Sequence, residues 1–440
     1  MPIQNFPSTL QPIIQQGFLE REFQQALRSK LAYRACADRV IIAAGIGETL
    51  TKTRAGLKPT VTSPMVPSLN TNLDNGLTPT TWGVEQYTIS MNLYAATTDL
   101  NVVTEQVGIA SQFLQNAYVN GEQAGRSLDE LARNALFAAY LGGNTRVTAT
   151  LSSAGPTISV DDIRGFQVCF VNGVQQSVTS TNPMVVTVGA NTYSLISATA
   201  DATNGSKAPN GVSGTLTFSG NVSVSDGTSG NSVIAASGAS IVRPSQRGNT
   251  SQLLASDTLT MSCLLDAVAK LRLNAVPEID GAYNCYLDPV SSRQLFADPD
   301  FKQLFQGATS ANQVFRNGMT NDFLGLRFVP TTEAFVQSHP SLSGLMIRRP
   351  VICGRGALIE GDFAAIGSQD VAPADSIINV VDGIAMVTRE AIDRLQQIIA
   401  QSWYWIGGFC APSDTTTNPS TVPTATNAAY KRAVVVEHVG

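Results

Sequence analysis

The chain has 440 residues, of which 43% are hydrophobic and only 14% are charged, and its formal net charge is −5. This charged fraction is well below the usual quarter, which is typical of a protein largely covered by neighbours or of a β-rich protein coated with serine and threonine. The sequence has no run of lysines or arginines with interleaved aromatic residues, which argues against a dedicated nucleic-acid binder. A protein that merely encloses nucleic acid needs no such patch.

The length predicts two or three compact units. The N-terminus has neither the basic stretch nor the long apolar core of a signal peptide. No apolar run approaches the roughly 18 residues of a membrane span. The six cysteines are scattered and form no C-x-x-C pair, so we expect isolated thiols in a reducing cytoplasm rather than a disulfide or metal framework; they are Cys36, Cys169, Cys263, Cys285, Cys353 and Cys410.

The first 35 residues read as an arm that ends in a helix, with apolar residues at helical spacing from Phe18 to Leu31. Residues 39–59 then read as a strand, a glycine turn and a second strand. Residues 60–98 are rich in Pro, Thr and Asn before they become extended in "TTWGVEQYTISMNLY". Both faces of this alternating stretch are mixed, whereas a half-buried strand shows one polar face. We therefore expect a long hairpin arm that packs on both sides.

The longest helical pattern runs from about Asp99 to Leu141, with Gly108, Gly121 and Gly125 as points where it could bend. From Thr145 to about Thr250 the chain turns to Ser, Thr, Gly, Asn and Val, and hairpin signals recur at Asn172-Gly173, Ser219-Gly220 and Asp226-Gly227. This predicts an inserted β-sandwich or barrel. Our hypothesis is that the insert projects outward and that residues 150–245 are dispensable for the fold.

After Ser251 helices and strands alternate as far as about residue 410. A linker, "APSDTTTNPSTVPTATN", follows, and then the strand-like "YKRAVVVEHV". A strand beyond a linker has no obvious partner in its own domain. It either folds back or adds to the sheet of a neighbouring subunit.

Few residues predict catalysis or cofactor binding. "VIIAAGIGETL" has Gly45-x-Gly47 after a strand but lacks the third glycine and the following helix of a dinucleotide site. Only two histidines, His339 and His438, are available for a Ser-His-Asp device, and no histidine or cysteine cluster is available for zinc. We therefore expect no enzyme activity, no cofactor and no metal.

Paired carboxylates remain in "LDPVSSRQLFADPDF" (residues 287–301) and in Glu360-Gly-Asp362. Aspartate before proline fits turn initiation or an N-cap. We interpret Asp298 and Asp300 as caps of a short helix rather than as an active site.

The segments "LLDAVAKLRLNAVPEIDGAYNCYLDPVSSRQLFADPDFKQLF" and "NGMTNDFLGLRFVPTTEAF", with "GIGETLTKTRAGLKP" near the front, resemble the major capsid (coat) proteins of tailed bacteriophages, the HK ninety-seven type. The residue-level resemblance is closest over residues 256–335. It implies an α+β phage capsid fold with an N-terminal arm, an extended loop, a long spine helix, and axial and peripheral domains, here with an inserted all-β domain.

The resemblance divides the chain by role, and the order along the chain extends that division to its end. The ranges are 1–59, N-terminal arm; 60–98, extended loop; 99–145, spine helix of the peripheral domain; 146–250, inserted β domain; 251–380, axial domain; 381–410, return strands of the peripheral domain; and 411–440, linker and C-terminal strand. The function implied is self-assembly into hexamers and pentamers of an icosahedral shell around double-stranded DNA. The expected partners are further copies of the chain, with scaffold, portal and decoration proteins, and no membrane. The expected location is the virion capsid, assembled in the host cytoplasm.

Seven residues are candidates for subunit contacts under this resemblance: Lys52, Arg54, Trp82, Glu85, Tyr87, Arg348 and Arg349. The four cationic residues are candidate ion-pair partners for acidic residues on neighbours. Each could equally be an ordinary solvated charge or a core aromatic residue, because surface ion pairs are common and weak. Two alternative functions stay open: a β-rich virion or cell-surface adhesin, based on the insert and the Ser/Thr-rich tail, and a nucleotide-using enzyme, based on "AAGIGETL" alone.

Overall fold

In the computed structural model the structure describes residues 32–43, 47–55, 84–101, 112–171, 174–201, 212–235, 241–248, 250–302, 322–323, 325–339, 344–363, 378–389, 397–412 and 432–440. Over these residues the chain is α+β, and it divides into two compact units. Unit 1 comprises Met1–Leu50, Thr88–Ala135 and Leu358–Cys410; unit 2 comprises Thr51–Tyr87, Leu136–Ala357 and Ala411–Gly440. Within the described part, no helix has the length and apolar character needed to cross a membrane.

Unit 1 is built on a six-stranded mixed sheet with the order β1-β20-β23-β22-β21, in which β4 also pairs with β23. β1 is parallel to β20, and the other pairs are antiparallel. β23 is the longest strand and pairs with β4 from Ile398–Asn101 to Gly407–Asn92. The strands are β1 (Ala37–Ile42), β4 (Asn92–Asn101), β20 (Leu358–Phe363), β21 (Ile378–Val381), β22 (Ile384–Arg389) and β23 (Ile398–Cys410), with a short helix η1 (Arg34–Cys36) before β1.

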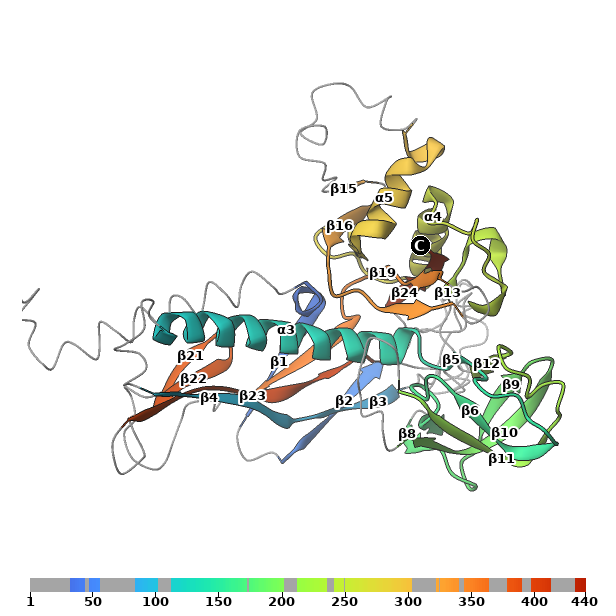
Figure 1. Ribbon diagram of the computed structural model, residues 1–440, viewed down its shortest axis with the longest axis horizontal. Helices are drawn as coiled ribbons and strands as arrows, with labels where there is room; N and C mark the ends of the chain where they lie inside the picture. The colour runs from blue at the N-terminus through green and yellow to red at the C-terminus, as the bar shows by residue number, and fades with distance from the viewer. Residues whose placement is uncertain are drawn as a thin grey trace, which may run out of the picture. The chain divides into compact units, whose positions relative to one another are not determined.

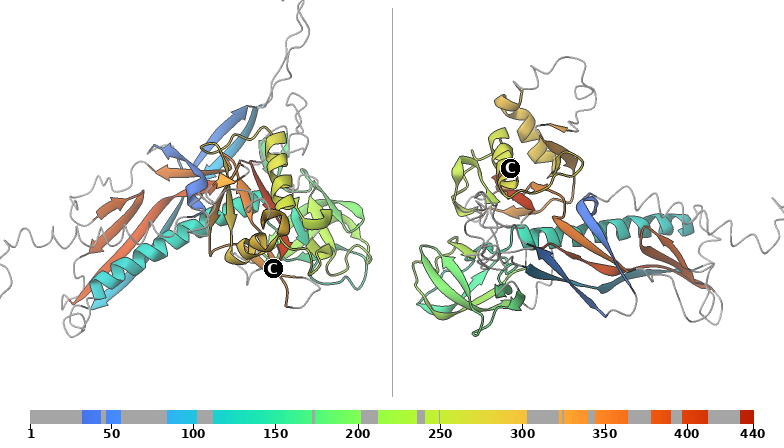
Figure 2. Two further views of the ribbon diagram at one scale, coloured as in Figure 1. Left: turned by 90° about the horizontal axis from the view of Figure 1, so that it is seen from above. Right: turned by 180° about the vertical axis from the view of Figure 1, so that it is seen from behind.

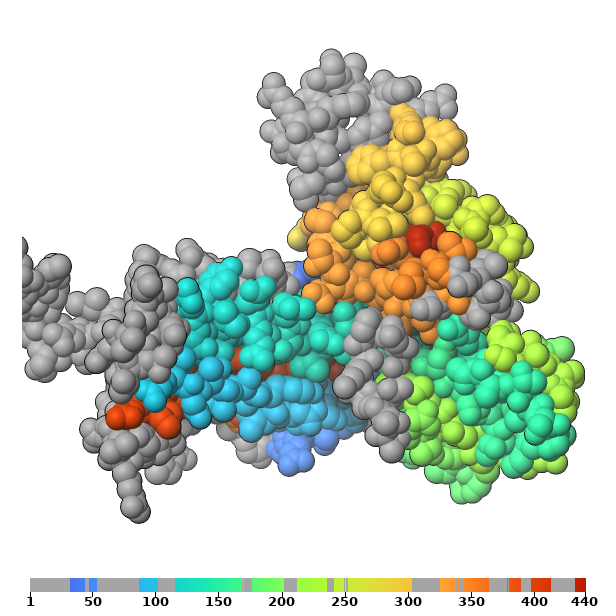
Figure 3. All heavy atoms as spheres, viewed as in Figure 1, coloured from blue at the N-terminus to red at the C-terminus, as the bar shows by residue number. Residues whose placement is uncertain are grey.

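The long helix α3 (Gln112–Tyr140) lies along this sheet (Figures 1 and 2), and in the space-filling view its atoms adjoin those of β4 (Figure 3). Its 29 residues span about 44 Å at about 1.5 Å per residue. Ala117, Ala124 and Leu128 pack on β21, β22 and β23, where Trp405 stacks between Tyr94 and Phe409. Small residues on this face let the helix approach the large tryptophan rings.

The sequence predicted this helix, but its predicted start at Asp99 is wrong. Asp99 lies in β4, opposite Ala400 of β23. The apolar residues at helical steps begin only at Val103, and Asp99 was included as a candidate N-cap. Its pairing in β4 excludes that role. The glycines Gly121 and Gly125 do not interrupt α3, and both are buried within it.

The strands β2 (Thr49–Ala55) and β3 (Val84–Ser90) form a two-stranded sheet of their own. The N–H of Met91 donates to the carbonyl of Glu48 at 2.9 Å at the end of this pair. The strand–turn–strand prediction for residues 39–59 is confirmed by β1 and β2, with Gly47 at a φ of 104° between them. The predicted extended loop ends too late, because residues 92–98 belong to β4 in the unit 1 sheet.

The insert is a closed barrel of six antiparallel strands in the order β5-β12-β9-β10-β11-β6. Closure comes from a bridge between Val147 and Val160, beside an N–H of Thr148 that donates to Ser159 at 2.9 Å. The interior is apolar and includes Phe166, Leu195 and Phe218. The strands are β5 (Asn144–Arg146), β6 (Gly155–Val160), β9 (Met184–Val188), β10 (Asn191–Ala200), β11 (Gly214–Val222) and β12 (Ser232–Ala235), and a separate antiparallel pair is β7 (Val168–Val171) with β8 (Val174–Ser177).

The three hairpin predictions have different outcomes. Asn172-Gly173, which is outside the described residues, connects the antiparallel β7 and β8 along the chain. Asp226-Gly227 lies in a turn, but it is not a hairpin, because the strands on either side, β11 and β12, do not pair with each other. The prediction at Ser219-Gly220 is wrong, because both residues lie inside β11. There the register with β6 shifts between Thr217 and Val222. A glycine inside a strand marks such irregularities as readily as a turn.

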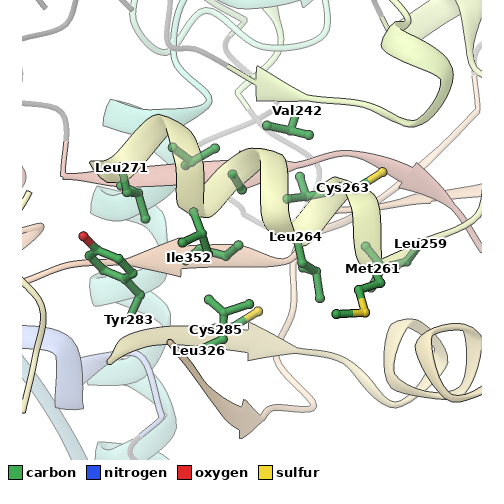
Figure 4. Close-up of a cluster of buried hydrophobic side chains, with 14 of the residues drawn as sticks. Val242, Leu259, Met261, Cys263, Leu264, Leu271, Tyr283, Cys285, Leu326 and Ile352 are labelled. Carbon is green, nitrogen blue, oxygen red and sulfur yellow. The ribbon is translucent and has the colours of Figure 1, made fainter. Parts of the chain in front are cut away.

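The rest of unit 2 is an α/β arrangement on a second six-stranded sheet, β13-β24-β19-β14-β16-β15. Helix α4 (Met261–Leu273) packs on this sheet through Leu264 and Leu271, next to Tyr283, Cys285 and Ile352 (Figure 4). Asp280 and Gly281 have positive φ values of 49° and 85° and turn the chain into β14. The elements are β13 (Ile241–Val242), β14 (Tyr283–Leu287), α5 (Pro289–Ala297), β15 (Asp322–Phe323), β16 (Leu326–Pro330), β19 (Val351–Cys353) and β24 (Ala433–Val436), with η3 (Pro244–Gln246) and η4 (Thr250–Gln252).

The C-terminal strand folds back on its own chain. β24 lies between β13 and β19, and the following β25 (His438–Val439) pairs with β18 (Met346–Arg348) in a three-stranded sheet with β17 (Val336–Ser338). Of the two possibilities that the sequence left open, the structure has the first. All four residues of β24 are buried.

The unit boundaries differ from the predicted ranges at two points. The predicted insert ends at residue 250, but β13 belongs to the α/β sheet through its pairing with β24. The predicted axial range runs to residue 380, but unit 1 begins again at Leu358 because β20 pairs with β1 and β23. Pairings between strands so far apart in sequence leave no local signal at these boundaries.

Candidate functional site

The predicted contact residues of the extended loop lie on the β2/β3 pair. Lys52 and Arg54 lie in β2, and Glu85 and Tyr87 lie in β3. The side chains of Lys52 and Tyr87 are half-buried. Trp82 lies outside the described residues. The role of these residues in subunit contacts stays a prediction.

Arg348 has a partner in its own chain. Its Nη1 lies 2.5 Å from Oδ2 of Asp288. The same carboxylate is the N-cap of α5, where it accepts from the N–H groups of Val290 at 3.2 Å and Ser291 at 3.4 Å. Asp288 therefore caps α5 and also forms an ion pair with Arg348, so the charge of Arg348 is compensated within the chain.

Arg349 is buried and also pairs within its chain. Its Nε donates to Oε1 of Glu437 at 2.8 Å, and its Nη2 donates to Oε1 of Gln337 at 2.6 Å. Arg243 holds the other oxygen of Glu437 at 2.7 Å. Burial by itself would raise the pKa of Glu437, but the two guanidinium charges outweigh it and lower that pKa to about 2. Arg348 and Arg349 therefore each pair with an acidic residue of their own chain.

The ring of Phe335 joins several segments of unit 2. The guanidinium carbon of Arg349 lies 4.6 Å from its centroid and that of Arg164 lies 5.4 Å from it. Phe137 at the end of α3 stacks on the same ring at 5.1 Å. Cation–π contacts strengthen when they are desolvated, and Phe335 is fully buried. The barrel insert is therefore anchored by Arg164, which argues against a loosely attached appendage.

A serine, a histidine and an aspartate meet in the core, although no sequence pattern predicted their contact. Ser291 Oγ lies 2.7 Å from Nε2 of His438, and the same hydroxyl contacts Asp288. Burial lowers the pKa of His438 to about 4. In a nucleophilic triad the carboxylate orients the histidine, whereas here it contacts the serine, and all three side chains are buried. These contacts hold the C-terminal strand in place, and their burial leaves no access for a substrate.

Of the two aspartates of "ADPDF", Asp298 acts as a cap, as predicted. Oδ1 of Asp298 accepts from the N–H of Asp300 at 3.2 Å at the start of the helical residues 299–302. Its Oδ2 accepts from the N–H of Met261 at 2.7 Å and so also caps α4. This second role was not visible in the sequence, because the two residues are 37 positions apart.

An ionic cluster with a buried centre, Arg34 and Glu360, fixes the N-terminal end of the described chain in unit 1. Arg34 donates from Nε to both oxygens of Glu360 at 2.9 and 3.0 Å, and Arg39 lies 2.8 Å from Asp382. Oδ1 of Asp129 on α3 accepts the N–H groups of Ala32, Tyr33 and Arg34 at 3.0, 2.6 and 3.2 Å. Glu360, a candidate acid in the sequence, is thus a partner of Arg34 in the core.

The remaining candidates for chemistry are accounted for by packing. All six cysteines are free thiols. His339 is buried and its Nε2 lies 2.8 Å from the carbonyl of Leu253. In the part of the chain that the structure describes, no three His, Cys, Asp or Glu residues group as a metal site would need.

Comparisons with known proteins give structural likeness only. No protein-family model and no curated protein matches the chain. The chain is similar to the capsid of Ralstonia phage GP4, with 10% identity, a TM-score of 0.48 and coverage of 94% of this chain and 90% of that one. It is similar to a chain of the capsid of cyanophage P-SCSP1u, with 11% identity, a TM-score of 0.47 and coverage of 93% and 88%. It is also similar to the capsid asymmetric unit of cyanophage Pam1, with 11% identity, a TM-score of 0.45 and coverage of 91% of this chain and 88% of that one.

Proposed function

We propose that the chain is the major capsid protein of a tailed bacteriophage and that copies of it assemble into hexamers and pentamers of an icosahedral shell around packaged double-stranded DNA. The observation that carries the proposal is the β2/β3 pair. Among the described strands, these two pair only with each other. An isolated two-stranded sheet is marginally stable in water. The chain itself supports the end of this pair next to the unit 1 sheet, since Ile89 of β3 is fully buried, whereas the described side chains of β2 are exposed or half-buried. A neighbouring copy would cover β2.

The segment with the closest residue-level resemblance to capsid proteins supports the proposal. The resemblance implies a helix, a "DGxY" turn, a strand, a proline and a helix, followed by a "GxRFVxTTEA" strand. In the chain these are α4, the Asp280–Gly281 turn, β14, α5 from Pro289, and β16. β14 and β16 lie side by side and parallel, with Tyr283 opposite Leu326.

The composition supports extensive contacts between copies. Only 14% of the residues are charged, and the cores of subunit interfaces are depleted in charge. The alternative of a β-rich adhesin explains the barrel but not the resemblance of residues 256–335, and we do not favour it. We further propose that the protein is structural rather than enzymatic, resides in the virion capsid after assembly in the host cytoplasm, and acts with scaffold, portal and decoration proteins.

Within this proposal Lys52, Arg54, Trp82, Glu85 and Tyr87 contact a neighbouring copy. The test is Tyr87→Ala in β3, with Val185→Ala, an exposed residue of barrel strand β9, as the matched control. Assembly is measured by sedimentation of particles from producing cells, and folding by the thermal transition of the unassembled protein. We expect Tyr87→Ala to lower particle yield at least about tenfold, a loss of about 1.4 kcal/mol per contact, at a temperature well below the thermal transition of the unassembled variant, where the variant is folded. Equal particle yields for both variants would contradict a contact role for this arm.

A further inference from the structure

The C-terminal strand occupies a slot that unit 2 leaves between two of its own strands. β24 pairs in parallel with β13, with Ile241 opposite Val435, and antiparallel with β19, with Val351 opposite Val435 and Cys353 opposite Ala433. Two neighbouring strands therefore saturate the backbone of β24 on both edges. Without this segment, β13 and β19 would each expose an unpaired edge in the middle of the sheet, which is the arrangement that accepts an added strand.

The next two residues dock into a different sheet and extend the slot. Val439 lies opposite Ile347 in β18, and its N–H donates to the carbonyl of Asp257 at 2.9 Å. Gln294 on α5 donates to the carbonyl of Val439 at 2.9 Å. Backbone hydrogen bonds thus hold the segment along its whole length.

Charge makes the slot selective for this segment. Glu437 enters between Arg243 and Arg349, whose side chains are 6% and 4% exposed, at 2.7 and 2.8 Å. Thr250 adds a hydrogen bond to Glu437 at 3.0 Å. A slot without its glutamate would hold two buried guanidinium groups with no carboxylate between them, which destabilises the folded state because buried charges are left unpaired. An occupant therefore needs an extended apolar run followed by an acid, as in "AVVVEHV".

A long stretch of chain connects the C-terminal segment to the preceding strand. Residues 411–432 separate β23 from β24 and are rich in Pro, Ser and Thr. At no more than about 3.4 Å per residue, a stretch of about 22 residues reaches up to roughly 75 Å. The segment from another copy of the chain would make the same contacts in the slot, because every one of them is non-covalent.

We propose that the slot between β13 and β19 is a binding site for residues 432–440 that accepts this segment from a second copy of the chain as well as from its own. Exchange of the segment then links copies through a strand of unit 2. This inference does not depend on the proposed function, because it concerns the slot and the segment in unassembled chains.

Cys353 allows a direct test. The N–H of Gly354 donates to Arg432 at 2.8 Å and that of Val436 donates to Pro350 at 2.9 Å. The alternation of an antiparallel ladder therefore makes Cys353 and Ala433 a non-hydrogen-bonded pair, in which Cα atoms lie about 4.5 Å apart. That separation is within the range of a disulfide. Ala433→Cys thus places a thiol opposite Cys353 whenever the slot is filled.

The two thiols are then divided between two full-length chains. The donor carries Ala433→Cys with Cys353→Ser, and the acceptor is the unsubstituted chain. They are unfolded together, refolded at high concentration, oxidised with glutathione disulfide and separated on a non-reducing gel. We expect a covalent donor–acceptor dimer at least about tenfold above that obtained with a Cys353→Ser acceptor. Glu437→Gln in the donor should lower the dimer yield by a similar factor, since it removes the charge that the slot recognises.

The chain with Ala433→Cys alone is the positive control, because its own segment should close an intrachain disulfide. If that disulfide forms while the mixed pair gives no more dimer than the Cys353→Ser acceptor, the inference is overturned. If Ala433→Cys does not fold, the pair Val435→Cys and Val351→Cys, which lie opposite each other in the same ladder, replaces it. If refolding fails, co-expression of the two chains replaces the mixing step, with the same two outcomes.

Discussion

Asp129 is a buried carboxyl group that holds the N-terminal end of the described chain against α3. Burial raises the pKa of Asp129 from 3.8 to about 6, although the three N–H groups that it accepts and the nearby Arg133 act in the opposite direction. A folded-state pKa above the unfolded value means that the folded protein holds the proton more tightly. The group therefore supports folding most at low pH, and its contribution falls as the pH rises from about 4 through about 6.

Asp129→Asn removes this pH dependence while it keeps an acceptor oxygen for the three N–H groups. A shift of about 2 units at about 1.4 kcal/mol each predicts that the variant gains about 3 kcal/mol relative to the unsubstituted protein between pH 4 and pH 7. Urea unfolding at both pH values measures the difference, in which other titrating groups cancel. A difference that stays constant with pH would contradict the account. Asp129→Ala, the control, should cost at least about 2 kcal/mol at pH 4 because it leaves the N–H groups unmet.

Glu437 is the charge on which the C-terminal strand depends. Glu437→Gln leaves Arg243 and Arg349 without their carboxylate, and we expect a loss of about 3 kcal/mol or more in the free energy of unfolding. The matched control is Glu278→Gln, because Glu278 meets Arg272 at 3.4 Å with both side chains substantially exposed; its loss should stay within about 0.5 kcal/mol. Denaturant unfolding at pH 7 compares the two. Similar losses would show that the buried cluster adds nothing beyond a surface pair.

Residue roles could be predicted from the sequence where the partner is close along the chain. The caps at Asp298 and Asp288 follow from aspartate placed before proline, because an N-cap bonds within the next turn. The contacts of Ser291 with His438 and of Arg243 with Glu437 span 147 and 194 positions. No local pattern encodes such pairs, and so Arg349 was predicted to face a neighbour although it is buried.

At the scale of elements, the spacing of apolar residues and the turn residues predicted most strands and the two main helices. They did not predict where these elements begin and end. The alternation in β23 and the helical spacing in α4 are long and regular, whereas the boundary between β4 and α3 falls within residues 102–111, outside the described part of the chain. The order of the strands in each sheet could not be predicted from the sequence. β24 and β20 each take their place through partners that are distant along the chain.

The barrel insert offers a test of independence at this scale. Its first and last strands are paired, with Asn144 opposite Ile234, and the N–H of Ala235 donates to Gly143 at 2.8 Å. The ends of an excised piece would therefore lie together around an intact apolar core. We expect residues 142–236 alone to unfold in one cooperative thermal transition.

The complementary deletion must join Gly143 to Ala236 and spare β13. The earlier hypothesis, removal of residues 150–245, would delete a strand of the α/β sheet together with Arg243. We expect the corrected deletion to give soluble, folded protein, although it loses contacts of the insert such as those of Arg164 and Asp161 with Phe335 and Gln337. An unfolded product from the corrected deletion, or an excised barrel without a thermal transition, would show that the insert is integral to unit 2.

At the scale of the whole molecule, both units are assembled from segments that are discontinuous in sequence. Unit 1 takes three segments, and the chain leaves it and returns to it. The order of elements along the chain was predictable through the resemblance of residues 256–335 to capsid proteins. The division into two units was not, because it depends on which distant strands pair. Under the proposed function, such a chain contributes the geometry of its contacts with other copies.

The most direct measurement is light scattering coupled to size exclusion on the full-length chain, with negative-stain microscopy of the same fractions. The protein is measured alone after purification and in extracts of producing cells. We expect closed shells, or rings of five or six copies, in at least one of these samples. A monomer or small oligomer under every condition, with no shells in the cell extract, would contradict the proposed function.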